Sequence, residues 1–131
     1  MTYILTNLEA FTNSYIECAL WASTYESTRD GETWDQPIDG DYGPESIDPE
    51  SLKAMKDDCR KFVEENLETI EADPVQDFSD AGHDFFLTRN GHGAGFWDSD
   101  WAEPGSDKLD KASEAFGECH LYVENDTIYI I

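Results

Sequence analysis

The sequence predicts an α+β domain, in which two or three helices cover a small antiparallel sheet made of two hairpins. Three observations lead to this class. Apolar residues recur at helical spacing in separate segments, short apolar and aromatic runs flank turn residues, and the order is helix, acidic loop, helix, hairpin, helix, hairpin. The length of 131 residues suits one domain over residues 1–131, and an aromatic content of 13% argues against a disordered chain.

The first helix is expected from Leu8 to about Thr24. Thr6 or Asn7 can cap its start. Its apolar positions recur three and four residues apart, which is the spacing of one helix face. These positions are Leu8, Phe11, Tyr15, Cys18 and Ala19.

The composition changes between Glu26 and Glu50. This segment holds nine acidic residues against one basic residue, Arg29, together with three prolines and three glycines. Proline and glycine at this density are typical of turns, so the segment is predicted to be a long surface loop. A loop of this length inside a compact domain is often functional.

The second helix is predicted to start with Asp48 as its cap and Pro49 as its first residue, and to end before Pro74. Its apolar residues form one stripe, and its acidic residues gather on the opposite face. The second half, from Glu64 to Asp73, carries five acidic residues and no basic one. Each acid near a helix C-terminus opposes the macrodipole by about 0.3–1 kcal/mol, so local stability does not account for this arrangement.

The remaining segments are predicted to form two hairpins and a short helix. Within residues 84–98, the predicted strands DFFLTR and GFWD are joined through NGHGAG, where glycine permits the positive φ values of a turn. Ser106 is the expected cap of a helix that Gly117 closes. The C-terminal hairpin turns at Asn125–Asp126. That turn pairs Val123 with Ile128, Tyr122 with Tyr129, and Leu121 with Ile130.

A net charge of −22 limits the function classes. It makes nucleic acid and anionic membranes unsuitable as direct partners, and leaves a basic protein, divalent cations or solvation in high salt. The three cysteines are odd in number and far apart, which predicts reduced thiols in a cytoplasm. The N-terminal residues lack the basic start and long apolar run of an export or membrane signal, so neither destination is expected.

One hypothesis places a ligand, metal or catalytic site on the glycine-rich hairpin. His83 and His92 could bind a metal or transfer protons beside Asp84, and Arg89 could bind an anion. The spacings GxGxxG, GxxxxGK[ST], HExxH, CxxC and GxSxG do not occur. An EF-hand-like start at Asp39 has proline at the required glycine position. We therefore expect no cofactor, no dedicated metal and no catalytic residue.

The leading hypothesis is a non-enzymatic inhibitor that imitates nucleic acid and binds a basic protein. DNA presents one negative charge per about 1.7 Å of axis, and carboxylates about 5–6 Å apart on a folded surface can occupy a groove that binds it. A solvated acidic surface without a partner is the competing explanation. The expected partner-binding residues, with Trp34 and Tyr42 as aromatic anchors, are Asp30, Glu32, Trp34, Asp35, Asp39, Asp41, Tyr42, Glu64, Glu65, Glu68 and Glu71.

The block HDFFLTRNGHGAGFWD, within residues 81–98, resembles a block in a group of small, acidic, uncharacterised proteins encoded by bacteriophages. The chain is similar to this group also at YIECALW, at IDPESL and at SDKLDKASEAFGECHLYV, and it departs from it after Asp98. The group carries no assigned activity, so the resemblance transfers no catalytic residue. It implies a phage or prophage origin, a host bacterial cytoplasm, and inhibition of host enzymes that bind DNA.

Overall fold

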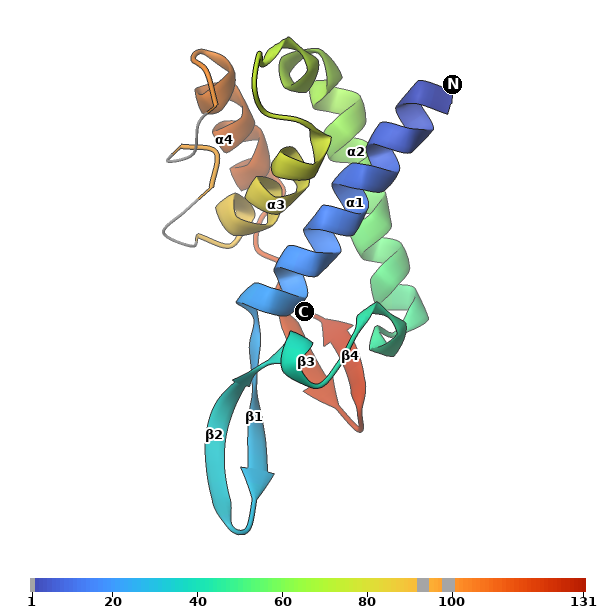
Figure 1. The fold of residues 1–131 in the computed structure, drawn as a ribbon, viewed down its shortest axis with the longest axis vertical. Coiled ribbons are helices and arrows are strands. Elements are labelled where there is room, and N and C mark those ends of the chain that lie inside the picture. Colours follow the sequence, from blue (N-terminus) through green and yellow to red (C-terminus); the bar gives the residue numbers. More distant parts are fainter. Residues whose placement is uncertain (1, 92–94, 98–100) are drawn as a thin grey trace.

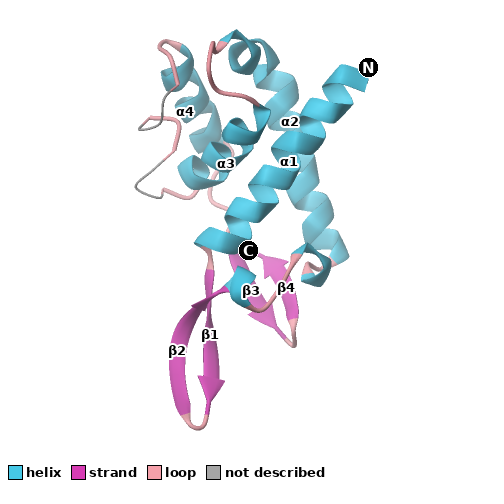
Figure 2. Cartoon of the chain, in the orientation of Figure 1, coloured by secondary structure: helices cyan, strands magenta, loops and turns pink. Residues whose placement is uncertain are grey.

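A computed structural model describes residues 2–91, 95–97 and 101–131, and in these residues the chain forms four α-helices and two hairpins (Figure 1). The α+β class is therefore confirmed. The helices gather in one part of the molecule and both hairpins lie at the other end (Figure 2). The hairpins form two separate two-stranded sheets, so the prediction of one shared sheet is wrong.

Helix α1 (Thr2–Ala22) packs along α3 (Phe78–Arg89). Gly82 of α3 makes the close approach possible, because a Cβ atom there would lie 2.0 Å from the carbonyl oxygen of Phe11. The helix begins before the predicted cap, and Thr6 and Asn7 lie inside it. Residues that favour caps are also tolerated within helices, so they gave the wrong boundary.

Helix α2 (Pro49–Ala72) confirms the second predicted helix. Asp48 is its cap and accepts a hydrogen bond from the backbone N–H of Ser51 at 3.0 Å. Asn66 interrupts the helical backbone with φ −123° and ψ 16°, and its side-chain amide donates to the carbonyl of Phe62 at 2.9 Å. This kink, which the sequence pattern did not predict, lies within the acidic second half of the helix.

The predicted hairpin within residues 84–98 is wrong, because its first strand is part of α3. The helix starts with a capping box, in which Asp77 and Asp80 accept hydrogen bonds from each other's backbone N–H at 3.0 Å. Apart from His83, every residue from 81 to 90 is buried. Because most of α3 is buried, it has no broad polar stripe, and its apolar run Phe85–Leu87 resembles a buried strand.

The predicted loop over Glu26–Glu50 is also wrong in its first half, where β1 (Thr24–Arg29) pairs with β2 (Glu32–Pro37). The turn residues Asp30 and Gly31 have φ values of 55° and 82°, as a type I′ hairpin turn requires. Two 3₁₀ turns follow, η1 (Ile38–Gly40) and η2 (Pro44–Ser46). The strands carry polar residues on both faces and so lack the alternation that normally reveals a strand.

The last three elements largely follow the prediction. Helix α4 (Gly105–Ala115) is present, but Ser106 lies inside it and donates its hydroxyl to the Phe96 carbonyl at 2.8 Å instead of capping the helix. Strands β3 (Leu121–Glu124) and β4 (Thr127–Ile130) confirm the C-terminal hairpin and its register. Asp48 donates its N–H to the Ile128 carbonyl at 2.8 Å, which attaches this hairpin to the start of α2.

Aromatic rings from three helices and the segment before α4 form the centre of the core. The rings of Phe62 on α2 and Phe85 on α3 stack with centroids 4.2 Å apart, and Phe11 of α1 lies within 6 Å of both. Phe96 stacks on Phe62 at 6.0 Å. Each such side chain contributes about 1.5–3 kcal/mol when fully buried, so this cluster holds the helices together against the charge of the surface.

Candidate functional site

The β1–β2 hairpin carries the first group of predicted contact residues. Asp30, Glu32, Trp34 and Asp35 are all exposed, and the hairpin extends away from the helices (Figure 1). The pairing register places Asp35 opposite Glu26, so these two carboxylates share one face. Trp34 and Glu32 lie on the other face. Acidic residues therefore occupy both faces of the hairpin.

The segment after the hairpin adds Asp39, Asp41 and Tyr42 to the same end of the molecule. The Tyr25 hydroxyl donates to Asp41, the Tyr42 hydroxyl donates to Asp126 at 2.8 Å, and the two rings meet edge to face at 5.4 Å. The hydrogen bond to Asp126 is the main cause that raises the pKa of Tyr42 to about 12. Asp126 lies 84 residues from Tyr42 along the chain, so sequence reasoning missed its part in this acidic end.

The acidic half of α2 forms the second predicted group. Glu64, Glu65, Glu68 and Glu71 are exposed. Glu64 pairs with Arg60 at 3.4 Å, and within the described part of the chain no ion pair reaches the other three. Asp73, at the end of this row, instead accepts backbone N–H groups from residues 75, 76 and 102 at 2.7–3.0 Å. These bonds lower its pKa despite the opposing effect of burial, so Asp73 is a structural residue.

The two acidic groups do not form one surface. The hairpin extends from the end where α1 finishes, whereas the second half of α2 lies at the opposite end of the helical part (Figure 1). Four basic residues, Lys53, Lys56, Arg60 and Lys61, occupy the first half of α2. A partner that covers the β1–β2 hairpin therefore contacts a different region from one that covers Glu65, Glu68 and Glu71.

Arg89 lies in the core of the fold, where protein groups surround its guanidinium. Its side chain is 3% exposed and contacts Asp58 and the Tyr15 hydroxyl, each at 3.0 Å. It also donates to the carbonyls of Gly117 at 2.8 Å and Phe116 at 3.4 Å. Burial alone would lower its pKa, but the neighbouring Tyr15 and Asp58 raise it, so the guanidinium stays charged.

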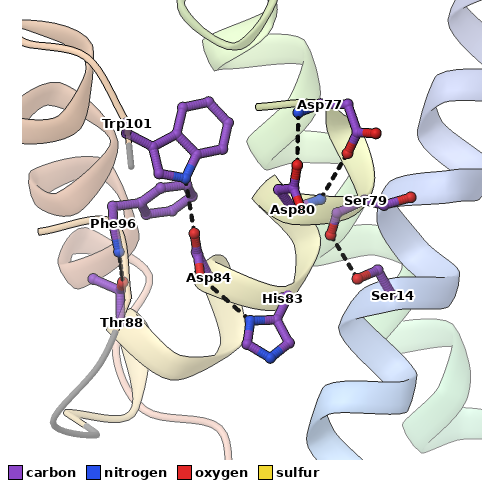
Figure 3. A network of polar contacts seen from close by, with 9 residues as sticks. All are labelled: Ser14, Asp77, Ser79, Asp80, His83, Asp84, Thr88, Phe96 and Trp101. Carbon is purple, nitrogen blue, oxygen red and sulfur yellow. Dashed lines mark hydrogen bonds and ion pairs between the residues drawn. The ribbon is translucent and has the colours of Figure 1, made fainter. Parts of the chain in front are cut away.

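His83 and Asp84 are adjacent on α3 and contact each other. Asp84 stands between the imidazole of His83 and the indole of Trp101 (Figure 3), accepting from the indole N–H at 2.8 Å and lying 3.2 Å from Nδ1 of His83. The alternative site is therefore divided: His83 and Asp84 are in contact, Arg89 binds core groups, and His92 lies outside the described residues. Within the described residues, no three His, Cys, Asp or Glu side chains converge as a metal site.

A groove that the sequence did not predict runs beside His83. Its volume is about 610 Å³, and its walls include Leu20, Trp21, Tyr42 and Pro44, with carboxylates at its edge. Cys18 lines it too, but burial first and the charge of Asp84 second raise the pKa of this thiol to about 12. The thiol is therefore no nucleophile at neutral pH. The spacing of Ser14, Cys18 and Trp21 on α1 was the only sequence signal for this groove.

Comparisons with known proteins supply no assignment. No family model matches the chain, and neither a curated protein nor a solved structure matches it. A search of the described helices finds none long and apolar enough to cross a membrane. The function therefore has to be argued from the surface itself.

Proposed function

We propose that the protein is an inhibitor that binds the basic, nucleic-acid-binding surface of another protein, with the hairpin end as its contact surface. The hairpin end comprises the β1–β2 hairpin, the segment 38–48 and the β3–β4 turn. The observation that carries the proposal is the exposure of Asp30, Glu32 and Asp35 on an arm that extends from the body. The resemblance to phage proteins suggests a host enzyme in the bacterial cytoplasm as the target.

The charge density of the arm suits the imitation of one nucleic-acid strand. Six-residue strands span about 20 Å at about 3.3 Å per residue. One DNA strand presents about six phosphates over that length and a duplex about twelve. The hairpin offers four carboxylates, from Glu26, Asp30, Glu32 and Asp35. The segment that follows adds further carboxylates beside it, so the end as a whole approaches the charge of a single strand.

The opposed acidic residues of the β1–β2 hairpin destabilise it locally. This cost argues against the explanation that the acidic surface only interacts with solvent. Glu26 and Asp35 face each other directly across the strands, where like charges are destabilising. An isolated two-stranded hairpin is marginally stable, and residues 32–35 of β2 are all exposed. A solvated surface would not require such pairs to be opposed. A basic partner would neutralise them on binding.

The test compares two variants that each remove three negative charges. The hairpin variant combines Asp30→Asn, Glu32→Gln and Asp35→Asn, and the matched control combines Glu65→Gln, Glu68→Gln and Glu71→Gln. Each immobilised protein is exposed to a bacterial lysate at about 0.05 M and about 0.5 M salt, where screening differs strongly. Captured proteins are identified, purified and assayed for nucleic-acid binding with and without the inhibitor.

We expect the wild-type protein to capture a nucleic-acid-binding protein at low salt and to release it at high salt. The hairpin variant should bind that protein at least about tenfold more weakly, and the control should bind nearly as well as wild type. Inhibition is rejected if the captured protein binds nucleic acid equally well in the presence of saturating inhibitor. Loss of capture in the α2 control alone would place the contact on Glu65, Glu68 and Glu71 instead.

A further inference from the structure

We infer that the groove between α1, His83 of α3 and the segment 39–44 binds an arginine side chain of the partner protein. This inference rests on the proposed function, because it identifies how a basic partner is recognised beside the hairpin end. The groove volume of about 610 Å³ falls within the range of about 300–1,000 Å³ that is typical of ligand pockets. It therefore has room for a side chain together with its flanking backbone.

Trp21 provides the flat surface that a guanidinium group requires. Its side chain stands on the last turn of α1 and is 61% exposed, although the neighbouring Leu20 is buried. The indole lies beside the His83 ring, with centroids 6.4 Å apart and planes tilted by 33°. A guanidinium over an exposed indole is attracted to the negative face of the ring.

Charge selects a cation for this groove. Glu17 and Asp39 are both exposed and line it, and among the described residues that line it none is Lys or Arg. Glu17 is one helical turn before Trp21 on α1, so carboxylate and indole stand on the same face of the helix. A carboxylate beside an aromatic ring can accept two hydrogen bonds from the guanidinium that stacks on the ring. An anionic ligand would be repelled by the same groups.

The pair of indole and carboxylate favours arginine over lysine. Arginine has a planar cation that stacks on aromatic faces and binds carboxylates through two parallel hydrogen bonds. Lysine has a compact, strongly hydrated charge that gains less from the ring. The groove shares Asp39 and Tyr42 with the hairpin end, so an arginine seated here would be next to the contact surface proposed above.

The inference is tested on the isolated protein with two labelled peptides of equal length and charge. One alternates arginine with glycine, and the other alternates lysine with glycine. Binding is measured by fluorescence anisotropy for the wild-type protein and for Trp21→Ala and Glu17→Gln. The matched controls are Trp97→Ala, whose side chain is 59% exposed elsewhere, and Glu9→Gln, an exposed acid on the same helix.

We expect Trp21→Ala to weaken binding of the arginine peptide by about five- to tenfold and binding of the lysine peptide by less than about twofold. Glu17→Gln should weaken binding of the arginine peptide by about two- to fivefold, whereas Trp97→Ala and Glu9→Gln should leave its binding unchanged. Equal binding of both peptides by the wild-type protein overturns the inference, and so does an equal effect of the two tryptophan substitutions.

The two proposals fail in different experiments. If the peptides bind as expected but no nucleic-acid-binding protein is captured and inhibited, the groove binds arginine and the inhibitor function is wrong. If such a protein is captured in a salt-dependent way but Trp21→Ala has no effect on either peptide, the inhibitor function stands and the groove inference is wrong.

Discussion

Replacement of Arg89 by methionine is expected to destabilise the fold strongly, because four acceptors depend on one buried guanidinium. Two of them, the carbonyls of Phe116 and Gly117, follow α4, while Tyr15 lies on α1 and Asp58 on α2. Arg89 itself is the last residue of α3. The side chain thus joins all four helices. Methionine retains much of its apolar stem but none of its donors.

The size of the expected stability loss depends on whether each hydrogen-bond partner of Arg89 can reach water after the substitution. Breaking a buried charged pair costs about 3–5 kcal/mol. The lower part of this range applies, because Asp58 is 38% exposed and regains water, and the contact to Phe116 is long at 3.4 Å. The buried Tyr15 hydroxyl loses its partner without access to water. We expect a loss of about 3–4 kcal/mol, which lowers Tm by about 10–15 °C in a domain of this size.

Urea unfolding followed by circular dichroism measures this loss at pH 7. Asp58→Asn is the comparison: the amide oxygen can still accept from Arg89, but the buried guanidinium loses its counter-charge, so the free energy of unfolding should fall by about 1–3 kcal/mol, less than for Arg89→Met. Arg89→Lys should fall between the two, since lysine keeps the charge but cannot contact all four acceptors. A loss below about 1 kcal/mol for Arg89→Met would refute this reasoning and return Arg89 to the alternative ligand site.

Three further predictions concern packing, pH and salt. Gly82→Ala should lower the free energy of unfolding in urea by more than about 2 kcal/mol, because the added Cβ would lie 2.0 Å from the carbonyl oxygen of Phe11. This cost outweighs the higher helix propensity of alanine, which is worth about 1 kcal/mol. Gly105→Ala is the control and should be nearly neutral, because the atom nearest to its added Cβ is 3.4 Å away. Burial first, and then the charge of Glu114, raises the pKa of Asp110. The protonated side chain of Asp110 therefore contributes to stability below the ordinary pKa of about 3.9, and this contribution is lost as pH rises through the raised value. Asp110→Asn should therefore raise Tm at pH 7 and not at about pH 3, and an equal effect at both pH values would contradict this. An increase in NaCl from about 0.01 M to about 1 M shortens the Debye length from about 30 Å to about 3 Å and should raise Tm, whereas a fall would show that self-repulsion of the charge of −22 does not limit stability.

The elements that were predicted correctly are marked by residues at their own ends or turns. Asp48 and Pro49 mark the start of α2, and the turn Asn125–Asp126 sets the register of the last hairpin. Helix α3 could not be predicted this way, because most of its residues are buried and no broad polar stripe remains. The β1–β2 hairpin did carry a local signal, the Asp30–Gly31 turn, but its strands have no apolar face to support it.

The candidate site was predictable in composition and not in arrangement. Surface exposure of the chosen acids followed from their charge, since carboxylates are almost never fully buried without partners. Which of them lie together depends on tertiary contacts. Asp126 joins the hairpin end through Tyr42, while Glu68 and Glu71 lie beyond the kink at Asn66, at the opposite end. The groove at Trp21 likewise exists only because η1 and α3 meet α1.

Most described residues of the glycine- and aromatic-rich block, in the ranges 81–90 and 95–96, are buried, and this burial accounts for the scarcity of acidic residues there. A Cβ atom at Gly95 would lie 2.2 Å from the Thr88 hydroxyl, and that hydroxyl accepts the N–H of Phe96 at 3.1 Å. An added carboxylate here would lose its hydration without a partner, at a cost of several kcal/mol. The one acid present, Asp84, accepts from the Trp101 indole. The buried residues of this block therefore specify packing, and their substitution should alter partner binding only through the stability of the fold. Neutralising substitutions of the hairpin acids should instead weaken binding without loss of stability.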